Sequence, residues 1–397
     1  GIFRTFPVQL SNPEKQARFA MKILILSTNT GGGHNAAGNA MIDALTELGV
    51  RAEMVDSLAI ASEWGSKTVS GVYASVARHS PRVFGAGYRV VGKLSPKHGH
   101  SASYALNLVN IRRLEEYIFQ TAPDAIITTH VFSSQALTHL IKRGKIGALT
   151  FGIMTDYNVT LFWEETRLDA YILPHPDLVA PYMAKGMPAK RLFPYGIPVT
   201  PQIAPERDIA AAKRAYGIDP ECKHVIVAGG SMGAGKLPRT VRALDETLPS
   251  SVVISAVCGN NAAAKEELEA MGNPRVRVLG YVSPLNAFLA SADVVITKAG
   301  GLTSTETLVQ RVPLIALHSI PPIETDNAAF FQARGLAYNA KNDEKACRAA
   351  VKILYDPNVQ AGMLHAARQH IPKDASRRAA RLIVNSVEHG RITSPEK

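Results

Sequence analysis

The segment best suited to chemistry runs from Lys298 to Glu306 and reads Lys-Ala-Gly-Gly-Leu-Thr-Ser-Thr-Glu. It follows the apolar run 292–297, which predicts a buried strand that turns tightly at the glycines into a helix. Free N–H groups at a helix N-terminus attract phosphate, and a glutamate one turn further in can accept hydrogen bonds from a ribose diol. The segment therefore suits a nucleotide diphosphate. The alternative is an ordinary capped helix, since Thr303 and Glu306 have capping-box spacing.

A second glycine-rich turn, residues 229–235, follows the predicted strand 224–228. Its glycines let backbone amides approach a phosphate, but no GK[ST] sequence ends it, so it is not a P-loop. Two such turns at adjacent strand ends can hold one diphosphate and its ribose. A third loop, residues 321–327, has polar groups able to hold sugar hydroxyls, although Pro-Pro loops of this kind are also common surface turns.

The first half of the chain has candidate bases at the ends of its predicted strands. His34 follows three glycines, and Asp156 follows the strand 148–154. A histidine at a helix N-terminus should have a lowered pKa, which favours a neutral ring able to accept a proton. His130 and His175 also follow predicted strands, and spacing alone does not rank the four.

These groups need elements to position them, and the alternation of strands and helices predicts mostly parallel sheets covered by helices. The predicted strands are 22–27, 51–55, 125–129, 148–154 and 170–173, then 224–228, 252–257, 276–279, 294–297 and 314–316. The proline-rich stretch 194–201 separates the two series as a linker would. We expect residues 1–20 to be an extension, 21–197 and 198–374 to be two domains, and the C-terminal helix within 375–397 to pack back on the first.

The composition indicates in which compartment the protein works and which surfaces it could bind. The chain has 397 residues, a net charge of +11 and three cysteines that form no metal-binding frame, which fits a reducing cytoplasm. No run of about 18 apolar residues is present, so no membrane-spanning helix is expected. From residue 64 to 113 the chain lacks Asp and Glu but has Arg82, Arg89 and Lys93 interleaved with Phe84 and Tyr88. Such a stretch suits an anionic lipid or nucleic-acid surface, or is a solvated helical face.

With these motifs in this order, the chain resembles the glycolipid-forming glycosyltransferases, namely the processive diacylglycerol glucosyltransferases and monogalactosyldiacylglycerol synthases. The resemblance covers nearly all of 21–388, through residues 31–37, 154–157 with Trp163, 196–198, 229–233 and 298–306. The lipid-linked N-acetylglucosaminyltransferase of peptidoglycan synthesis is similar in the same loops but differs in the first glycine loop. Two departures from the family pattern are Thr160, where a histidine is usual, and the loop 321–327, which keeps Glu324 and Asn327 but lacks the usual Gln.

The resemblance implies a GT-B fold, in which two Rossmann-like α/β domains face each other across a cleft. It also implies inversion at the anomeric carbon, UDP-glucose or UDP-galactose as donor, and neither metal nor cofactor. His34 and Asp156 would then be the catalytic candidates. The implied nucleotide-sugar residues are Gly230, Ser231, Met232, Gly233, Val282, Gly300, Gly301, Thr303, Ser304, Glu306, Glu324 and Asn327. The expected acceptor and membrane residues are Gly33, Arg82, Phe84, Tyr88, Arg89, Lys93 and Trp163.

The expected activity is transfer of a hexose from a UDP-sugar to diacylglycerol by a peripheral enzyme on the cytoplasmic face of the cell membrane. Anionic lipid is then the expected surface, and nucleic acid is not an expected partner. One alternative is a UDP-GlcNAc-dependent transferase acting on another lipid-linked acceptor. Others are an NAD-dependent oxidoreductase using the first glycine turn with Asp56, whose spacing departs from G-x-G-x-x-G, and a non-catalytic lipid-binding protein.

Overall fold

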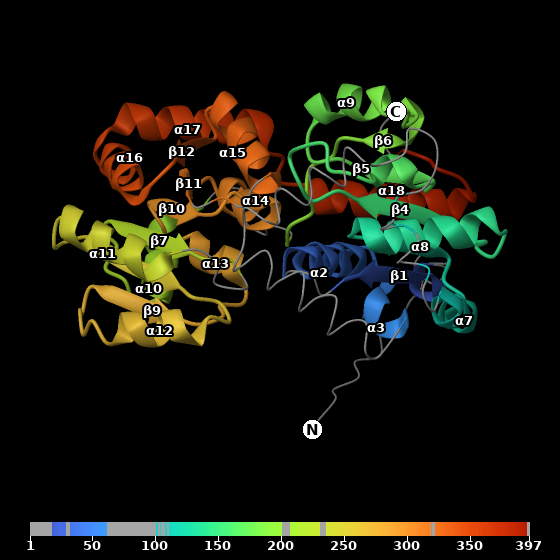
Figure 1. Ribbon diagram of the computed structural model, residues 1–397, viewed down its shortest axis with the longest axis horizontal. Helices are drawn as coiled ribbons and strands as arrows, with labels where there is room; N and C mark the ends of the chain where they lie inside the picture. Colours follow the sequence, from blue (N-terminus) through green and yellow to red (C-terminus); the bar gives the residue numbers. More distant parts are fainter. Residues whose placement is uncertain are drawn as a thin grey trace.

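The computed structural model describes residues 18–28, 32–61, 101, 104, 108, 111–200, 207–230, 236–317, 319 and 322–394. These residues form two α/β domains that lie side by side (Figure 1), each built on a six-stranded sheet. Every strand pairing in both sheets is parallel. The predicted architecture of two parallel α/β domains is therefore confirmed.

The N-terminal sheet has the strand order β2-β1-β3-β4-β5-β6. Its strands are β1 Lys22–Ser27, β2 Arg51–Asp56, β3 Ala125–Thr128, β4 Leu149–Ile153, β5 Ala170–Ile172 and β6 Leu192–Phe193. The central strands β1, β3 and β4 are apolar because helices cover them on both faces. The sequence pattern missed β6, which has two residues and therefore no periodicity to read.

The C-terminal sheet has the order β12-β11-β10-β7-β8-β9. Its strands are β7 His224–Ala228, β8 Val253–Val257, β9 Val276–Leu279, β10 Val294–Thr297, β11 Leu314–Leu317 and β12 Ala337–Ala340. The first five were predicted. The edge strand β12, with the sequence Ala-Tyr-Asn-Ala, was missed because it has no apolar run.

The helices cover both faces of each sheet. Those of the N-terminal domain are α2 Gly32–Glu47, α3 Ser57–Ala61, α7 Ile111–Thr121, α8 Val131–Lys142 and α9 Val179–Ala184, with the short 3-10 helices η1 Trp163–Glu165, η2 Pro176–Leu178 and η3 Ala189–Arg191. Those of the C-terminal domain are α10 Ile209–Ala215, α11 Leu237–Thr247, α12 Ala262–Glu269, α13 Leu285–Leu289, α14 Gly301–Val309, α15 Ile323–Ala333, α16 Asp343–Tyr355 and α17 Pro357–His370. None of the helices in the described ranges has the length and apolar character needed to cross a bilayer.

The last helix, α18 Ala375–His389, returns to the N-terminal domain and packs on α2 and β4. Its apolar face includes Leu382 and Ile383, which have no exposed surface. The two chain crossings between the domains meet at Gly196 and Pro372. A Cβ on Gly196 would lie 2.7 Å from Pro372 Cγ, and its φ of +99° also favours glycine.

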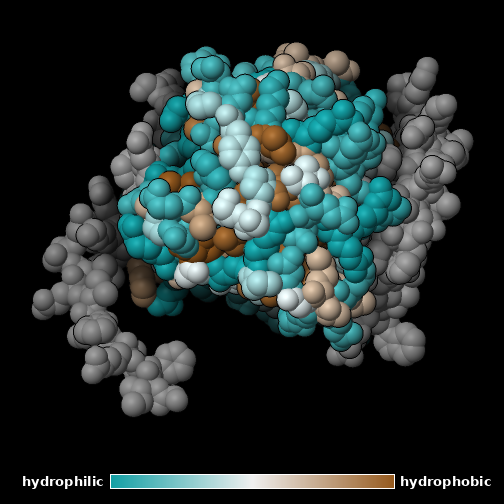
Figure 2. Space-filling view, turned by 90° about the vertical axis from the view of Figure 1, so that its left-hand side faces the viewer, coloured by the Kyte–Doolittle hydropathy of each residue, from teal (hydrophilic) through white to brown (hydrophobic). Residues whose placement is uncertain are grey.

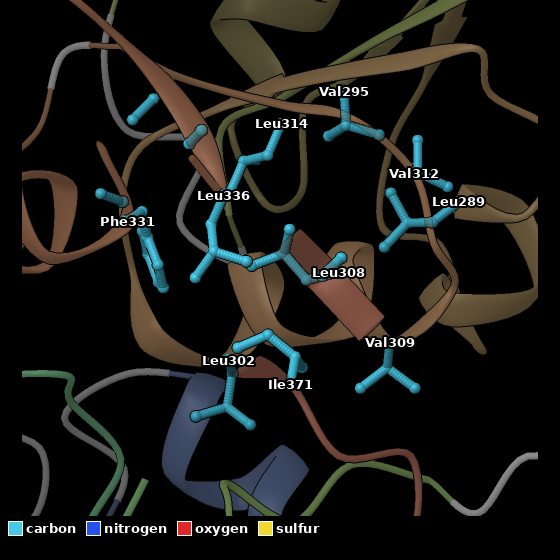
Figure 3. Close-up of a cluster of buried hydrophobic side chains, with 14 of the residues drawn as sticks. Leu289, Val295, Leu302, Leu308, Val309, Val312, Leu314, Phe331, Leu336 and Ile371 are labelled. Atoms are coloured by element: carbon cyan, nitrogen blue, oxygen red, sulfur yellow. The ribbon is translucent and has the colours of Figure 1, made fainter. Parts of the chain in front are cut away.

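One apolar cluster continues from the C-terminal core into the contact between the domains. Figure 3 shows its C-terminal members, among them Leu302 and Leu308 of α14 and Ile371. Ala37 of α2 and Tyr157 belong to the same cluster from the other domain. Burial of this shared cluster holds the N-terminus of α14 against the N-terminal domain.

The outer face of the C-terminal domain is mostly hydrophilic in its described residues, with hydrophobic atoms in small patches (Figure 2). A surface of this kind is typical of a face in contact with water.

Candidate active site

A cleft with a volume of about 720 Å³ lies between the two domains. One wall is the start of α2, with Gly33 and Asn35, and the other includes Leu302, Thr303 and Glu306 of α14. The remaining lining residues are Gly32, Ala36, Asn39, Asp43, Thr200, Ala228, Gly230, Val257, Gly259, Asn260, Tyr281, Val282, Ser283, Pro284, Leu285 and Asn286. The cleft therefore brings together Gly33, Gly230, Val282, Thr303 and Glu306 from the predicted site.

The N-terminus of α14 presents free backbone donors. The helix begins at Gly301, and its N-cap Gly300 makes no side-chain capping bond. The capping-box alternative is thus wrong, because Thr303 lies inside the first turn and not at the N-cap. Within the described residues, no hydrogen bond uses the N–H groups of Gly301, Leu302 or Thr303. These donors and the helix dipole together can bind an anion.

Glu306 is a half-buried carboxyl on the cleft wall, one turn beyond those donors. It makes no side-chain hydrogen bond or ion pair to any described residue. Desolvation by the surrounding protein raises the pKa of Glu306 to about 7. A desolvated carboxyl without a partner can accept hydrogen bonds from the hydroxyls of a ligand.

Lys298 begins the segment singled out in the sequence, but no role of its own was predicted for it. It follows β10, and its Nζ lies 2.6 Å from Oε1 of Glu324 on α15. Its side chain also passes Gly230, where an added Cβ would lie 3.0 Å from Lys298 Cε. A cation beside the end of β7 and near the N-terminus of α14 can stabilise negative charge at both turns. The signal available in the sequence was a lysine directly after a buried strand.

Several other residues that were expected to bind the nucleotide sugar are not on the cleft wall or lie outside the described residues. The second half of the first turn of α14 faces the protein, and Ser304 has no exposed surface. Its hydroxyl is therefore not available in the cleft. Ser231, Met232 and Gly233 lie outside the described residues. Gly301 does not line the cleft but packs against the other domain, where a Cβ would lie 1.7 Å from the carbonyl oxygen of Thr155.

His34, the third residue of α2, is held in one tautomer. Its Nδ1 lies 2.8 Å from the carbonyl oxygen of Thr129, which only accepts, so Nδ1–H donates and Nε2 keeps its lone pair. The ring of His130 packs edge-on against it with a centroid distance of 4.5 Å. Burial lowers the pKa of His34 to about 4. The predicted neutral ring is therefore present, and desolvation is the cause.

Asp156 lies at the domain contact. Desolvation raises the pKa of Asp156 to about 6, and the nearby Glu324 carboxylate adds to this, while Lys298 and a hydrogen bond from Asn327 oppose it. That bond runs from Asn327 Nδ2 to Asp156 Oδ1 over 3.0 Å. Thr155, the preceding residue, has its Oγ1 3.4 Å from His34 Nδ1. Thr155 thus connects the two candidate bases, neither of which lines the 720 Å³ cleft.

The remaining candidate residues pack in the core, cap helices or lie outside the described residues. Trp163 is 4% exposed and packs in the core against Gly152 and Tyr171, which corrects its assignment to the acceptor or membrane surface. His130 and His175 are N-caps of α8 and η2, with side chains that accept from backbone N–H groups. The residues Arg82, Phe84, Tyr88, Arg89 and Lys93, and most of the acid-free segment, lie outside the described residues.

The arrangement provides an anion-binding helix end, a cation and a free carboxyl on one domain, and two candidate bases on the other. In the described part of the chain, no group of three or more His, Cys, Asp or Glu side chains could hold a metal ion.

The sequence of the chain is similar to those of several enzymes of lipid glycosylation. The family model for monogalactosyldiacylglycerol (MGDG) synthase matches residues 34–199, and the glycosyltransferase family 28 C-terminal domain matches 224–354. A processive diacylglycerol beta-glucosyltransferase from Bacillus pumilus is 30% identical over 348 residues, which cover 84% of this chain and 87% of the relative. The enzyme of the same name from Bacillus subtilis is 27% identical over 359 residues, covering 88% and 90%.

Solved structures agree with the fold. MurG from Acinetobacter baumannii has a TM-score of 0.60 at 16% identity, covering 92% of this chain and 99% of its own. The calicheamicin glycosyltransferase CalG4 has a TM-score of 0.61 at 15% identity, covering 93% and 99%. The predicted GT-B fold is confirmed by this likeness together with the two parallel sheets.

Proposed function

Because the chain belongs to the glycolipid-forming glycosyltransferases, the family of the processive diacylglycerol glucosyltransferases, we propose that it transfers a hexose from a UDP-sugar to diacylglycerol with inversion. The observation that carries the proposal is the wall of the cleft formed by α14. It combines free N–H groups at a helix N-terminus with an unpartnered carboxyl, Glu306, one turn away. These two features match the diphosphate and the ribose of a nucleotide sugar.

In the proposed donor complex, the N–H groups of Leu302 and Thr303, which lie on the cleft wall at the start of α14, bind the diphosphate. Glu306 accepts hydrogen bonds from the ribose, and the backbone near Val282 faces the uracil. Negative charge grows on the diphosphate as the bond to the anomeric carbon breaks. The helix dipole and Lys298 are fixed in place before the reaction, so they stabilise that charge without reorganisation or a metal ion.

On the acceptor side, the hydroxyl of diacylglycerol attacks the anomeric carbon as UDP leaves. Its proton goes to Nε2 of His34 or to the Asp156 carboxylate. With pKa values of about 4 and about 6, the two bases predict different pH dependence. Because a base must be deprotonated to act, kcat should fall with acid near pH 4 if His34 is the base and near pH 6 if it is Asp156.

The acceptor is a membrane lipid, so we propose that the enzyme works as a peripheral protein on the cytoplasmic face of the cell membrane. The support is the acid-free basic segment of the sequence, whose Lys and Arg side chains suit an anionic lipid surface.

The test is incubation with UDP-glucose, UDP-galactose or UDP-GlcNAc and with diacylglycerol in anionic vesicles, followed by mass analysis of the lipids and assay of UDP. We expect a hexosyl diacylglycerol from one of the first two donors, with activity retained in EDTA. A product formed only from UDP-GlcNAc on another lipid-linked acceptor, or UDP release without a glycolipid, would contradict the proposal.

A further inference from the structure

Asn327 is a wholly buried amide of α15 at the contact between the domains, with 0% of its surface exposed. Its Nδ2 donates to Asp156 Oδ1 and to the carbonyl oxygen of Ala299, each over 3.0 Å. Its Oδ1 accepts from Nδ2 of Asn158 over 3.0 Å. Both N–H groups and the oxygen are therefore in use, and no exposed polar atom remains for a sugar.

The orientation of this amide is fixed by its neighbours. Asn158 Nδ2 also donates to the carbonyl oxygen of Ile323 over 2.9 Å, so this group is the donor in its contact with Asn327. The Ala299 carbonyl can only accept. A flipped Asn327 would place its oxygen against that carbonyl and the Asp156 carboxylate, which would repel it. The amide is therefore held so that an N–H faces Asp156.

We infer that Asn327 is a positioning residue that holds Asp156 in place and keeps it ionised by donating a hydrogen bond from the opposite domain. This inference rests on the proposed function, in which Asp156 is one of two candidate bases. Asn327 was expected to contact the donor sugar; here its amide is wholly buried and its hydrogen bonds go to protein groups.

The bond to Asp156 joins the two domains, so it exists only when they are in contact. Asp156 and Asn158 belong to the N-terminal domain, whereas Asn327 and Ala299 belong to the other. The carboxylate is thus supported only when the Thr155 carbonyl rests on Gly301 at the start of α14. Asp156 is in this way coupled to the same helix that carries the proposed diphosphate donors.

The charges around Asp156 make Asn327 important for its ionisation. Burial disfavours the carboxylate, and Glu324 adds negative charge nearby. Two groups oppose these effects, the Asn327 amide and the Lys298 ammonium, and the ammonium is paired with Glu324 at 2.6 Å. Removing the amide donor leaves Asp156 with a poorly compensated charge, so the protonated form should become favoured near neutral pH.

The test uses Asn327→Asp, which preserves the side-chain shape but places a second carboxyl where the donor was. Two carboxyls at this distance share one proton, so ionisation of Asp156 should move to higher pH by about two units. Isotope-edited infrared spectroscopy of the carboxyl stretch, assigned by its loss in Asp156→Asn, follows this directly. We expect the ionised fraction at pH 7 to fall about tenfold, and the acid limb of kcat to move in the same direction.

Tyr157→Phe is the matched control. The Tyr157 hydroxyl makes another bond between the domains, to Thr305 Oγ1 at 2.9 Å, and its ring packs on Phe330 and Phe331. The variant loses a cross-domain hydrogen bond but keeps the bond from Asn327 to Asp156. Asn327→Leu, which removes the donor without adding charge, serves as a second variant should the aspartate disturb folding.

A shift of the Asp156 titration in either Asn327 variant but not in Tyr157→Phe supports the inference. An unchanged titration, or an equal shift in Tyr157→Phe, overturns it. If the wild-type protein transfers no hexose to diacylglycerol, the proposed function fails, while the infrared titration still decides whether Asn327 controls Asp156.

Discussion

Replacing Glu306 with glutamine should stabilise the ligand-free protein at pH 8 far more than at pH 5. Desolvation raises the pKa of this carboxyl from 4.5 to about 7 in the folded state. The folded protein therefore prefers the neutral form. Below pH 4.5 the group is neutral in both states and has little effect on stability. Between the two pKa values the unfolded chain ionises first, so the folded state loses stability as the pH rises.

The size of the effect follows from the shift. At about 1.4 kcal/mol for each unit, ionised Glu306 lowers the free energy of unfolding by about 3 kcal/mol at pH 8 and by less than about 1 kcal/mol at pH 5. Glutamine has no charge at either pH and avoids this cost. Urea unfolding followed by far-UV circular dichroism at both pH values measures the difference. Glu266→Gln, at an exposed position on α12 of the same domain, is the control.

The same substitution should weaken UDP binding, because a neutral amide accepts weaker hydrogen bonds from a ribose than a carboxylate does. We expect a loss of about 1 to 3 kcal/mol, or about 5- to 150-fold in Kd, by calorimetry. A stability gain of equal size at pH 5 and pH 8 would show that Glu306 is not desolvated as the cleft geometry indicates. Unchanged UDP affinity would remove Glu306 from the nucleotide site.

His34→Ala should reduce kcat by about 10²- to 10⁴-fold with little change in UDP affinity, and near-normal turnover at saturating lipid would leave Asp156 as the base. Gly301→Ala should separate the domains, because its methyl group would lie 1.7 Å from the Thr155 carbonyl oxygen, whereas Gly362→Ala, at a helical glycine with open space, should not. Small-angle scattering should show a larger radius of gyration for the first variant only, together with lower transfer activity. Replacing Arg82, Arg89 and Lys93 with Gln should weaken the free energy of binding to anionic vesicles at low salt by about 1 kcal/mol per residue, with UDP binding intact. Co-sedimentation with the vesicles measures this loss, and sedimentation equal to that of the parent protein would mean that the lipid enters elsewhere.

The sheets could be predicted from the sequence because their central strands are buried on both faces and read as continuous apolar runs. β10 is such a run, and the glycine turn and helix that follow it in sequence also follow it in space. The sequence of this one short segment therefore predicts most of the nucleotide-binding side of the site. Ser304 was misplaced because a residue's face on a helix depends on what the helix packs against, which spacing in one short segment does not show.

The acceptor side was harder to predict because its properties come from residues far apart in the sequence. The tautomer of His34 depends on a carbonyl 95 residues away, and the ionisation of Asp156 depends on an amide 171 residues away in the other domain. Trp163 was misassigned for a related reason. The sequence around a tryptophan near a functional loop is the same whether its side chain packs in the core or lies on the surface, and Trp163 packs in the core. Patterns of residue type locate such side chains at strand ends but do not show their partners.

The two halves of the site also differ in how they should respond to substrate. The Glu306 carboxyl and the N–H groups of the first turn of α14 have no protein partners among the described residues, so they are left to be satisfied by a ligand. Asp156 already has its partner, but that partner lies across the domain contact. A nucleotide bound to α14 occupies the cleft beside Gly33 of α2 and so favours contact between the domains. Donor binding should therefore favour the closed arrangement in which Asp156 is held by Asn327, and UDP should lower the pH at which Asp156 titrates in the wild-type protein but not in Asn327→Leu.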